Sequence, residues 1–147
     1  MSEQVWEFFL QYEDANRSSD TSAIGELYAS TFMFGGPNGV HAVQREDFLR
    51  LIPKMKAHLS SLGLVESQLR SVEANQISSR YLLANVGWRM STQSPSGSRH
   101  VDAIASYVLS RGTDDEFSIV FQIDHQDLAT AIQYQQNGGL PHSGTSE

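Results

Sequence analysis

The second half of the chain contains four long runs with the composition of β-strands, and neither face of these strands is predominantly polar. The runs cover residues 65–76, 80–92, 99–111 and 117–125, and the turn-forming sequences STQSPSGS and RGTDDE separate the last three. An antiparallel sheet that is apolar on both sides needs two covers, because each face must be kept from water. This requirement predicts an α+β domain in which helices cover only one of the two faces.

Three helices are predicted before these strands. In residues 3–17, apolar side chains recur every three or four positions, which is the spacing of a one-faced helix. Asp20 can cap a shorter second helix, since its carboxylate can accept hydrogen bonds from the free N–H groups of the first turn. A third helix carries an apolar stripe from Phe48 onward and stops near Gly63, and Pro53 is expected to kink it.

The length and the low charge content bear on domain organisation and assembly. A chain of 147 residues suits one domain, which we expect to span residues 1–136, with residues 137–147 forming a flexible tail. Charged residues make up only 18% of the chain, and this favours a surface that is partly covered. We therefore expect a twofold homodimer that pairs sheet to sheet. The alternative is one strongly curved sheet that covers most of its own core.

Composition also argues against several classes of partner. The net charge is −7 and no cluster of Lys and Arg offsets it, so nucleic acid is not an expected partner. The chain has no cysteine, and its five histidines lack metal-binding spacing, so neither a metal nor a cofactor is expected. No apolar run approaches the roughly 20 residues of a membrane span, and no basic leader is evident, so we expect a cytoplasmic location without membrane contact.

Hairpin symmetry suggests which side chains share a face. Pairing the strands symmetrically about Pro95 and Asp114 puts even-numbered residues of neighbouring strands together. A slip of one residue would exchange the two faces, so this assignment depends on the register. The even-numbered face then carries Trp88, His100, Asp102, Ile104, Ser106, Gln122 and Asp124.

Asp102 is the leading catalytic candidate on this face. A carboxylate flanked by Trp88 and Ile104 would be desolvated, which raises its pKa toward the range of a general base or a protonated hydrogen-bond donor. His100 lies two residues away and could share a proton with Asp102 or orient it. The structural alternative is that Asp102 reaches water or pairs with a neighbouring arginine, while His100 is solvated at the mouth of the hairpin.

Aromatic residues of the helices and of a short strand predicted at TFMF, residues 31–34, would converge on one cavity if the helices close it. Most aromatic stripes form core, but a buried tyrosine hydroxyl needs a partner, so Tyr12 and Tyr28 are the expected contacts for a ligand carbonyl. The predicted ligand-binding set is Phe9, Tyr12, Tyr28, Phe32, Trp88, Ile104, Ser106, Gln122 and Asp124.

The order of elements, together with the closing sequence SYVLSRGTDDEFSIVFQIDHQDL, resembles the nuclear transport factor 2-like superfamily. The similarity covers residues 3–136 and is greatest to small bacterial proteins related to polyketide cyclases, ketosteroid isomerase and scytalone dehydratase. It implies a cone, or cystatin-like roll, in which a curved antiparallel sheet wraps around three N-terminal helices and leaves a deep, largely apolar pocket. It also implies that Asp102 and Ile104 point into this pocket and that the outer sheet face forms a dimer.

The sequence departs from these relatives at one informative position. Trp88 falls near the place where dehydratase-like members carry a catalytic histidine, and a tryptophan cannot take up a proton at neutral pH. The complete dehydratase mechanism therefore cannot be assigned to this protein. Ketosteroid isomerase would require a tyrosine and two acids inside the cavity, and this sequence offers only candidates for these residues.

These observations predict a protein that holds a small, mostly apolar organic molecule. As an enzyme, it would be an acid–base isomerase, cyclase or dehydratase, with Asp102 as base or hydrogen-bond donor, His100 assisting, and Tyr12 or Tyr28 polarising a carbonyl. The alternative is a non-catalytic ligand-binding or interaction module. A third reading is that the cavity is vestigial and only the dimer matters.

Overall fold

The computed structural model describes residues 2–18 and 20–136, and the predicted tail at 137–147 lies outside these described residues. The described part is an α+β fold with four helices and one six-stranded sheet. The elements in chain order are α1 (Ser2–Arg17), α2 (Thr21–Gly25), β1 (Tyr28–Gly36), β2 (Gly39–Gln44), α3 (Arg45–Ser61), β3 (Leu64–Gln76), β4 (Tyr81–Ser94), β5 (Gly97–Arg111), β6 (Phe117–Asp124) and α4 (Leu128–Gln136).

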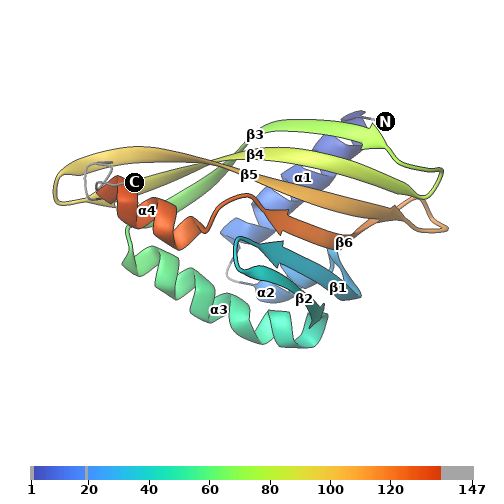
Figure 1. Ribbon diagram of the computed structural model, residues 1–147, viewed down its shortest axis with the longest axis horizontal. Coiled ribbons are helices and arrows are strands. Elements are labelled where there is room, and N and C mark those ends of the chain that lie inside the picture. The colour runs from blue at the N-terminus through green and yellow to red at the C-terminus, as the bar shows by residue number, and fades with distance from the viewer. Residues whose placement is uncertain (1, 19, 137–147) are drawn as a thin grey trace.

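The strand order in the sheet is β2-β1-β6-β5-β4-β3. Neighbouring strands are antiparallel except β1 and β6, which pair in parallel. In Figure 1 the long strands β3, β4 and β5 arch over the helices, and α4 lies between their far end and α3. The expected curved sheet with helices on its inner face is confirmed, with one parallel pair added to the antiparallel pattern.

The core lies between α1, α2, α3 and the concave face of this sheet. Alternate residues of β4 are buried, which is the period-two pattern of a strand with one covered face. The fully buried side chains of the helices and the sheet pack into a single cluster that includes Phe9, Tyr28, Phe32, Leu82, Tyr107, Leu109 and Ile119. The predicted aromatic residues of α1 and β1 are therefore part of the core.

Local sequence explains the helix ends. The Asp20 carboxylate accepts hydrogen bonds from the Ser22 N–H at 3.0 Å and the Ser22 hydroxyl at 2.6 Å, so the expected cap of α2 is confirmed. The apolar spacing of Ile24, Leu27 and Tyr28 predicts a helix that reaches Tyr28, but α2 ends at Gly25 and Tyr28 already belongs to β1. None of the helices in the described ranges is long and apolar enough to cross a membrane.

Candidate functional site

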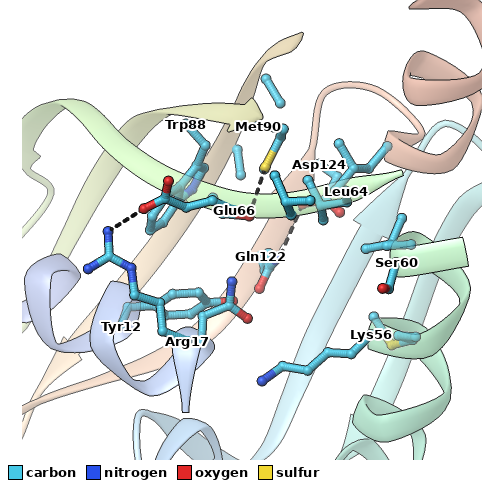
Figure 2. Close-up of a pocket in the computed structure, with 18 of the residues that line it drawn as sticks. Tyr12, Arg17, Lys56, Ser60, Leu64, Glu66, Trp88, Met90, Gln122 and Asp124 are labelled. Carbon is cyan, nitrogen blue, oxygen red and sulfur yellow. Dashed lines mark hydrogen bonds and ion pairs between the residues drawn. The ribbon is translucent and has the colours of Figure 1, made fainter. Parts of the chain in front are cut away.

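A cavity of about 860 Å³ opens between the concave face of the sheet and helices α1 and α3. Figure 2 shows it with Trp88 and Met90 of β4 on one side and Lys56 of α3 on another. Its apolar wall includes Leu59, Leu64, Trp88, Met90, Ala103, Ala105 and Leu128. Its polar and charged residues include Tyr12, Arg17, Lys56, Glu66, Tyr107, Gln122 and Asp124. The cavity is thus mostly apolar with a few converging polar groups, as is typical of small-molecule sites.

Five residues of the predicted ligand-binding set border this cavity: Tyr12, Trp88, Ile104, Gln122 and Asp124. Three others do not line it. Phe9 and Phe32 are buried in the core, and Tyr28 lies behind the wall, where its hydroxyl bonds to that of Tyr12. The remaining member, Ser106, belongs to the outer face of the sheet.

The predicted faces of β5 are wrong, because the β4–β5 hairpin is closed one residue differently. Ser94 pairs with Gly97, so Pro95 and Ser96 form a two-residue turn in place of a loop centred on Pro95. Gly97 has a φ of +121°, which glycine adopts with little cost. Even-numbered residues of β4 therefore pair with odd-numbered residues of β5, and the one-residue slip exchanges the faces of β5.

Asp102 consequently lies on the outer face, opposite Arg89 and away from Trp88. Its side chain is 68% exposed, and the Arg89 Nε atom lies 3.0 Å from its Oδ1 atom. The hydrogen bond from Arg89 holds the Asp102 pKa below its usual value. The expectation of a desolvated carboxylate with a raised pKa is therefore wrong for Asp102, and a catalytic role for it in this cavity has no geometric basis.

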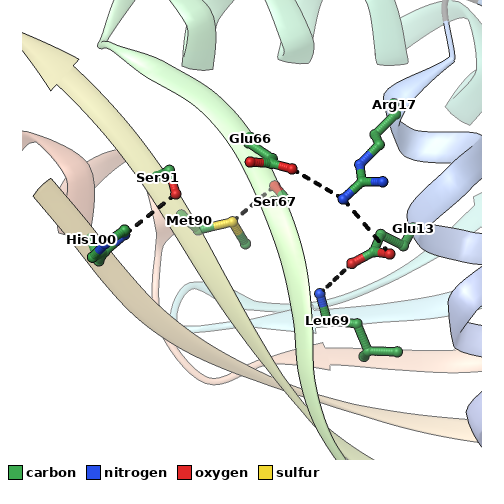
Figure 3. Close-up of polar contacts among 8 residues, drawn as sticks. All are labelled: Glu13, Arg17, Glu66, Ser67, Leu69, Met90, Ser91 and His100. Atoms are coloured by element: carbon green, nitrogen blue, oxygen red, sulfur yellow. Dashed lines mark hydrogen bonds and ion pairs between the residues drawn. The ribbon is translucent and has the colours of Figure 1, made fainter. Parts of the chain in front are cut away.

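His100 and Ser106 share the outer face with Asp102. His100 is exposed, and its Nδ1 atom lies 3.3 Å from the Ser91 hydroxyl (Figure 3). The Ser106 hydroxyl lies 2.6 Å from Asn85 Oδ1 and 2.7 Å from His125 Nε2. None of these groups reaches the Tyr12 side of the sheet. Ile104 is 48% exposed on this outer face and borders the cavity only at its edge.

A chain of hydrogen bonds runs from Tyr12 to Asp124 along the inner wall. The Tyr12 and Tyr28 hydroxyl oxygens are 2.8 Å apart, and the Tyr28 hydroxyl donates to Gln122 Oε1. The other end of the same amide, Gln122 Nε2, donates to Asp124 Oδ1 at 3.0 Å (Figure 2). Gln122 therefore joins two tyrosines to one carboxylate.

The direction of this chain follows from counting hydrogens. A tyrosine hydroxyl has one proton, and Tyr28 gives its proton to Gln122. The proton between the two tyrosines must then come from Tyr12. With Asp124 ionised, every donor in the chain points toward its carboxylate.

Tyr107 is an odd-numbered residue of β5, so the predicted face assignment put it on the outer side, whereas in the structure it lines the cavity. Its hydroxyl accepts a hydrogen bond from Trp88 Nε1 at 3.3 Å, and its ring lies 6.1 Å from that of Tyr12 between centroids. Tyr107 pairs with Gln122 because the register shifts by one residue between Val108 and Leu109. Its side of β5 is set by the β4–β5 hairpin, in which Tyr107 pairs with the buried Ala84, so the two-residue turn that moves Asp102 outward also brings Tyr107 inward.

Burial sets the protonation behaviour of these groups. Desolvation raises the Asp124 pKa above its ordinary value of 3.8, even though the bond from Gln122 and the nearby His125 act in the opposite direction. Desolvation likewise raises the pKa of Tyr12 to about 12 and the pKa of Tyr28 and Tyr107 well above 10. The tyrosines are therefore neutral hydrogen-bond donors, and Asp124 is the group in this network best suited to exchange protons.

The charged residues of the cavity lie toward α1 and α3. Arg17 Nη2 lies 3.0 Å from Glu66 Oε2 and 3.8 Å from Glu13 Oε1, so two carboxylates neutralise it. The Lys56 Nζ atom donates to the Ser18 carbonyl at 2.9 Å. Within the described residues, no group of three or more His, Asp or Glu side chains is arranged to hold a metal ion.

No family model matches the sequence, and a search of curated proteins finds no significant match. Solved structures do resemble it. A cystatin-like NTF2-like protein from Novosphingobium aromaticivorans is 14% identical with a TM-score of 0.69, over 89% of this chain and 87% of that chain. A Shewanella frigidimarina protein provisionally assigned as a ketosteroid isomerase is 13% identical with a TM-score of 0.63, over 80% and 91% of the two chains.

A third structure, from Catenulispora acidiphila, was solved in complex with S-DNPA. It is 13% identical with a TM-score of 0.69, over 88% of this chain and 95% of that chain. Likenesses at this level of identity establish architecture and leave the chemistry to the site. The chain has the nuclear transport factor 2-like, cystatin-like fold.

Proposed function

We propose that the cavity binds a small, mostly apolar organic molecule and that Asp124 is its acid–base group. The observation that carries this proposal is a carboxylate with a raised pKa on an otherwise largely apolar wall, held by Gln122 and connected to the hydroxyl of Tyr12. A carboxylate whose pKa is raised by burial is a better proton acceptor at neutral pH than an exposed one. Asp124 takes the role that the sequence suggested for Asp102.

The hydrogen-bond chain suggests how proton transfer and oxyanion stabilisation are coupled. When Asp124 removes a proton from a carbon next to a carbonyl, the electron pair of the broken C–H bond moves into an enolate and the carboxylate becomes a hydrogen-bond donor. The Gln122 amide can then turn over, so that it accepts from Asp124 and donates to Tyr28. Tyr28 in turn donates to Tyr12, and the Tyr12 proton becomes free for the enolate oxygen.

This sequence of events fits isomerisation or dehydration next to a carbonyl. Return of the proton from Asp124 to a different carbon gives an isomer, and loss of a leaving group from the enolate gives a dehydrated product. The alternative is a non-catalytic binding module, in which the same network only orients a ligand. The ligand-bound relative from Catenulispora acidiphila shows that a protein of this fold can hold a bound compound.

Solvent hydrogen exchange tests the catalytic proposal without knowledge of the natural substrate. A panel of small apolar ketones and enones in D₂O, followed by NMR, reports exchange at the carbon next to the carbonyl. We expect the wild-type protein to accelerate exchange for some members of the panel. The exchange rate with Asp124→Asn should be lower by at least about a hundredfold. Asp102→Asn is the matched control and should exchange at the wild-type rate.

Two results would oppose this assignment. Undiminished exchange by Asp124→Asn would exclude Asp124 as the base. Binding of panel members by the wild-type protein without any exchange would favour the non-catalytic module.

We also propose that a second copy covers the outer face of the sheet. Apolar side chains stand exposed there, among them Ile104 at 48% and Ile123 at 40%, and they flank the half-buried Leu83 and Val108. Light scattering tests this proposal: Ile104→Glu should convert a dimer into a monomer, while Ile77→Glu beyond the end of β3 should not. A monomeric wild-type protein would refute it.

A further inference from the structure

One corner of the cavity, between α1 and α3, is lined by Lys56 and by two neutral residues with hydrogen-bond donors. Asn16 and Ser18 come from the end of α1 and the connection after it, and both line the cavity together with Lys56 of α3, which Figure 2 labels. The Lys56 Nζ atom lies 2.9 Å from the Ser18 carbonyl oxygen, and both residues line the cavity. The ammonium group is therefore part of the cavity wall.

Lys56 differs from Arg17, the other cation of the cavity, in having no counter-ion among the described residues. Arg17 is paired with Glu66 and lies near Glu13, and Asp124 is held by the Gln122 amide on the sheet side. Among the described residues, no carboxylate lies within 4.0 Å of Lys56.

Asp14 and Asp20 are the acidic positions nearest to this corner in sequence; neither forms an ion pair with Lys56, and the Asp20 carboxylate caps α2 through Ser22. The bond from Lys56 to a neutral carbonyl satisfies one of three ammonium hydrogens and leaves the positive charge uncompensated. Partial burial removes water from this ammonium and lowers its pKa. An anionic partner would replace the stabilisation of the ammonium charge that is lost with the water.

Two further donors are available at the same place. The side chain of Asn16 forms no hydrogen bond within residues 2–18 and 20–136. The Ser18 hydroxyl accepts a bond from the Asp20 N–H, and its own proton has no acceptor in those ranges. Besides the Lys56 ammonium, the cavity lining therefore contains an amide and a hydroxyl whose donor hydrogens have no acceptor in those ranges.

We propose that the ligand is an organic acid whose carboxylate binds Lys56, with Asn16 and Ser18 as additional donors. One uncompensated positive charge matches one negative charge, which favours a carboxylate over a phosphate dianion. The apolar body of the acid would then cross the cavity over Met90 and Trp88 toward Asp124. This inference rests on the proposed function, since it names the class of molecule that the same cavity binds.

A purely structural role for Lys56 is the competing explanation. A lysine at the C-terminal end of a helix stabilises that end through its carbonyl groups, and the Ser18 carbonyl follows α1 directly. A structural role would not distinguish between charged and neutral ligands. The experiment must therefore compare ligands as well as variants.

A matched ligand pair provides this comparison. Calorimetric titration with 4-phenylbutyrate and its neutral amide should show that the wild-type protein binds the acid at least about tenfold more tightly. Lys56→Met should abolish the preference and leave the affinity for the amide unchanged. Lys54→Met is the control, because Lys54 is an exposed lysine of the same helix and its substitution removes the same charge.

Each other outcome overturns the inference. Equal affinity of the wild-type protein for acid and amide shows that the cavity binds ligands without reading their charge, which leaves the proposed function intact. A second outcome is that Lys56→Met keeps its circular dichroism and melting temperature but loses affinity for the acid and the amide equally. That result would show that Lys56 only shapes the cavity. Failure of both compounds to bind the wild-type protein overturns the cavity proposal together with this inference.

Discussion

Gln122 donates its Nε2 hydrogen to Asp124 Oδ1 across 3.0 Å, from a position two residues earlier on β6. This bond stabilises the ionised carboxylate, because an N–H group favours the charged form of its acceptor. We expect Gln122→Leu to raise the Asp124 pKa further, since burial remains and the stabilising donor is lost. Titration of the side-chain carboxyl carbon by NMR measures this shift. Gln126→Leu, at another cavity residue, is the control, and an unchanged pKa in Gln122→Leu would contradict the role of the amide.

The raised pKa of Asp124 makes a prediction for stability against pH. Its folded pKa lies above its unfolded pKa, so the folded state holds this proton more tightly, and the stabilising contribution of Asp124 is fully present below the unfolded value of about 3.8. Stability is then lost as the pH rises through the folded pKa of Asp124. Asn at this position cannot ionise, so Asp124→Asn should gain unfolding free energy relative to the wild type over the same range. Urea unfolding at a series of pH values measures the difference.

Asp102 provides a control, because its effect on stability should change with pH in the opposite direction. Its pKa is lowered by Arg89, so its contribution is present above the unfolded pKa and is lost as the pH falls through the folded pKa. Asp102→Asn should therefore be less stable than the wild type at neutral pH, with a small effect because the pair is exposed. A pH-independent difference between Asp124→Asn and the wild type would show that burial does not shift the Asp124 pKa.

Glu13 fastens α1 to the edge strand β3. Its Oε2 atom accepts a hydrogen bond from the Leu69 N–H at 2.6 Å, at a point where the register with β4 shifts (Figure 3). The residue is only 8% exposed, so Glu13→Ala would leave this N–H unpaired and cost about 2 kcal/mol of unfolding free energy. Glu13→Gln keeps a hydrogen-bond acceptor and should lose less unfolding free energy than Glu13→Ala. Glu7→Ala, at an exposed position of α1, is the control, and urea unfolding compares the three variants.

Gly97 fixes the β4–β5 register through its backbone conformation. Its φ of +121° is strained for any residue with a Cβ atom, and nothing lies within 4 Å of an added Cβ. Gly97→Ala should therefore destabilise the protein by at least about 1 kcal/mol through backbone strain alone. Gly36→Ala is the control, because its nearest neighbour would lie at an ordinary contact distance of 3.7 Å from the new Cβ. Equal thermal stability of the two variants would refute this explanation of the register.

Several features could be predicted from local sequence because local forces determine them. The helical spacing in α1, the Asp20 cap and the alternation in β4 each depend on residues that are near one another in the chain. The spacing of Gln122 and Asp124, two residues apart on one strand, likewise requires them to share a face, but it does not determine that this face is the inner one.

The face of β5 could not be predicted in this way. Symmetric pairing about Pro95 gave Asp102 a buried position, and the two-residue turn closed by Ser94 and Gly97 moved it to the outer face. The register shift beyond Leu109 then brought Tyr107 opposite Gln122. Each change is a single residue, but a strand repeats every two residues, so each one reverses which side chains enter the cavity.

The sequence by itself therefore determined the fold class and the order of elements, and it placed Tyr12 on the helix that borders the cavity. Only the tertiary structure decided which carboxylate lies in that cavity, and it selected Asp124 over Asp102. The physical reason is that amphipathic patterns and caps act within a few residues, whereas strand register depends on turn geometry and bulges whose cost is spread over the whole sheet. The network from Tyr12 to Asp124 exists because that register aligns residues from α1, β1 and β6.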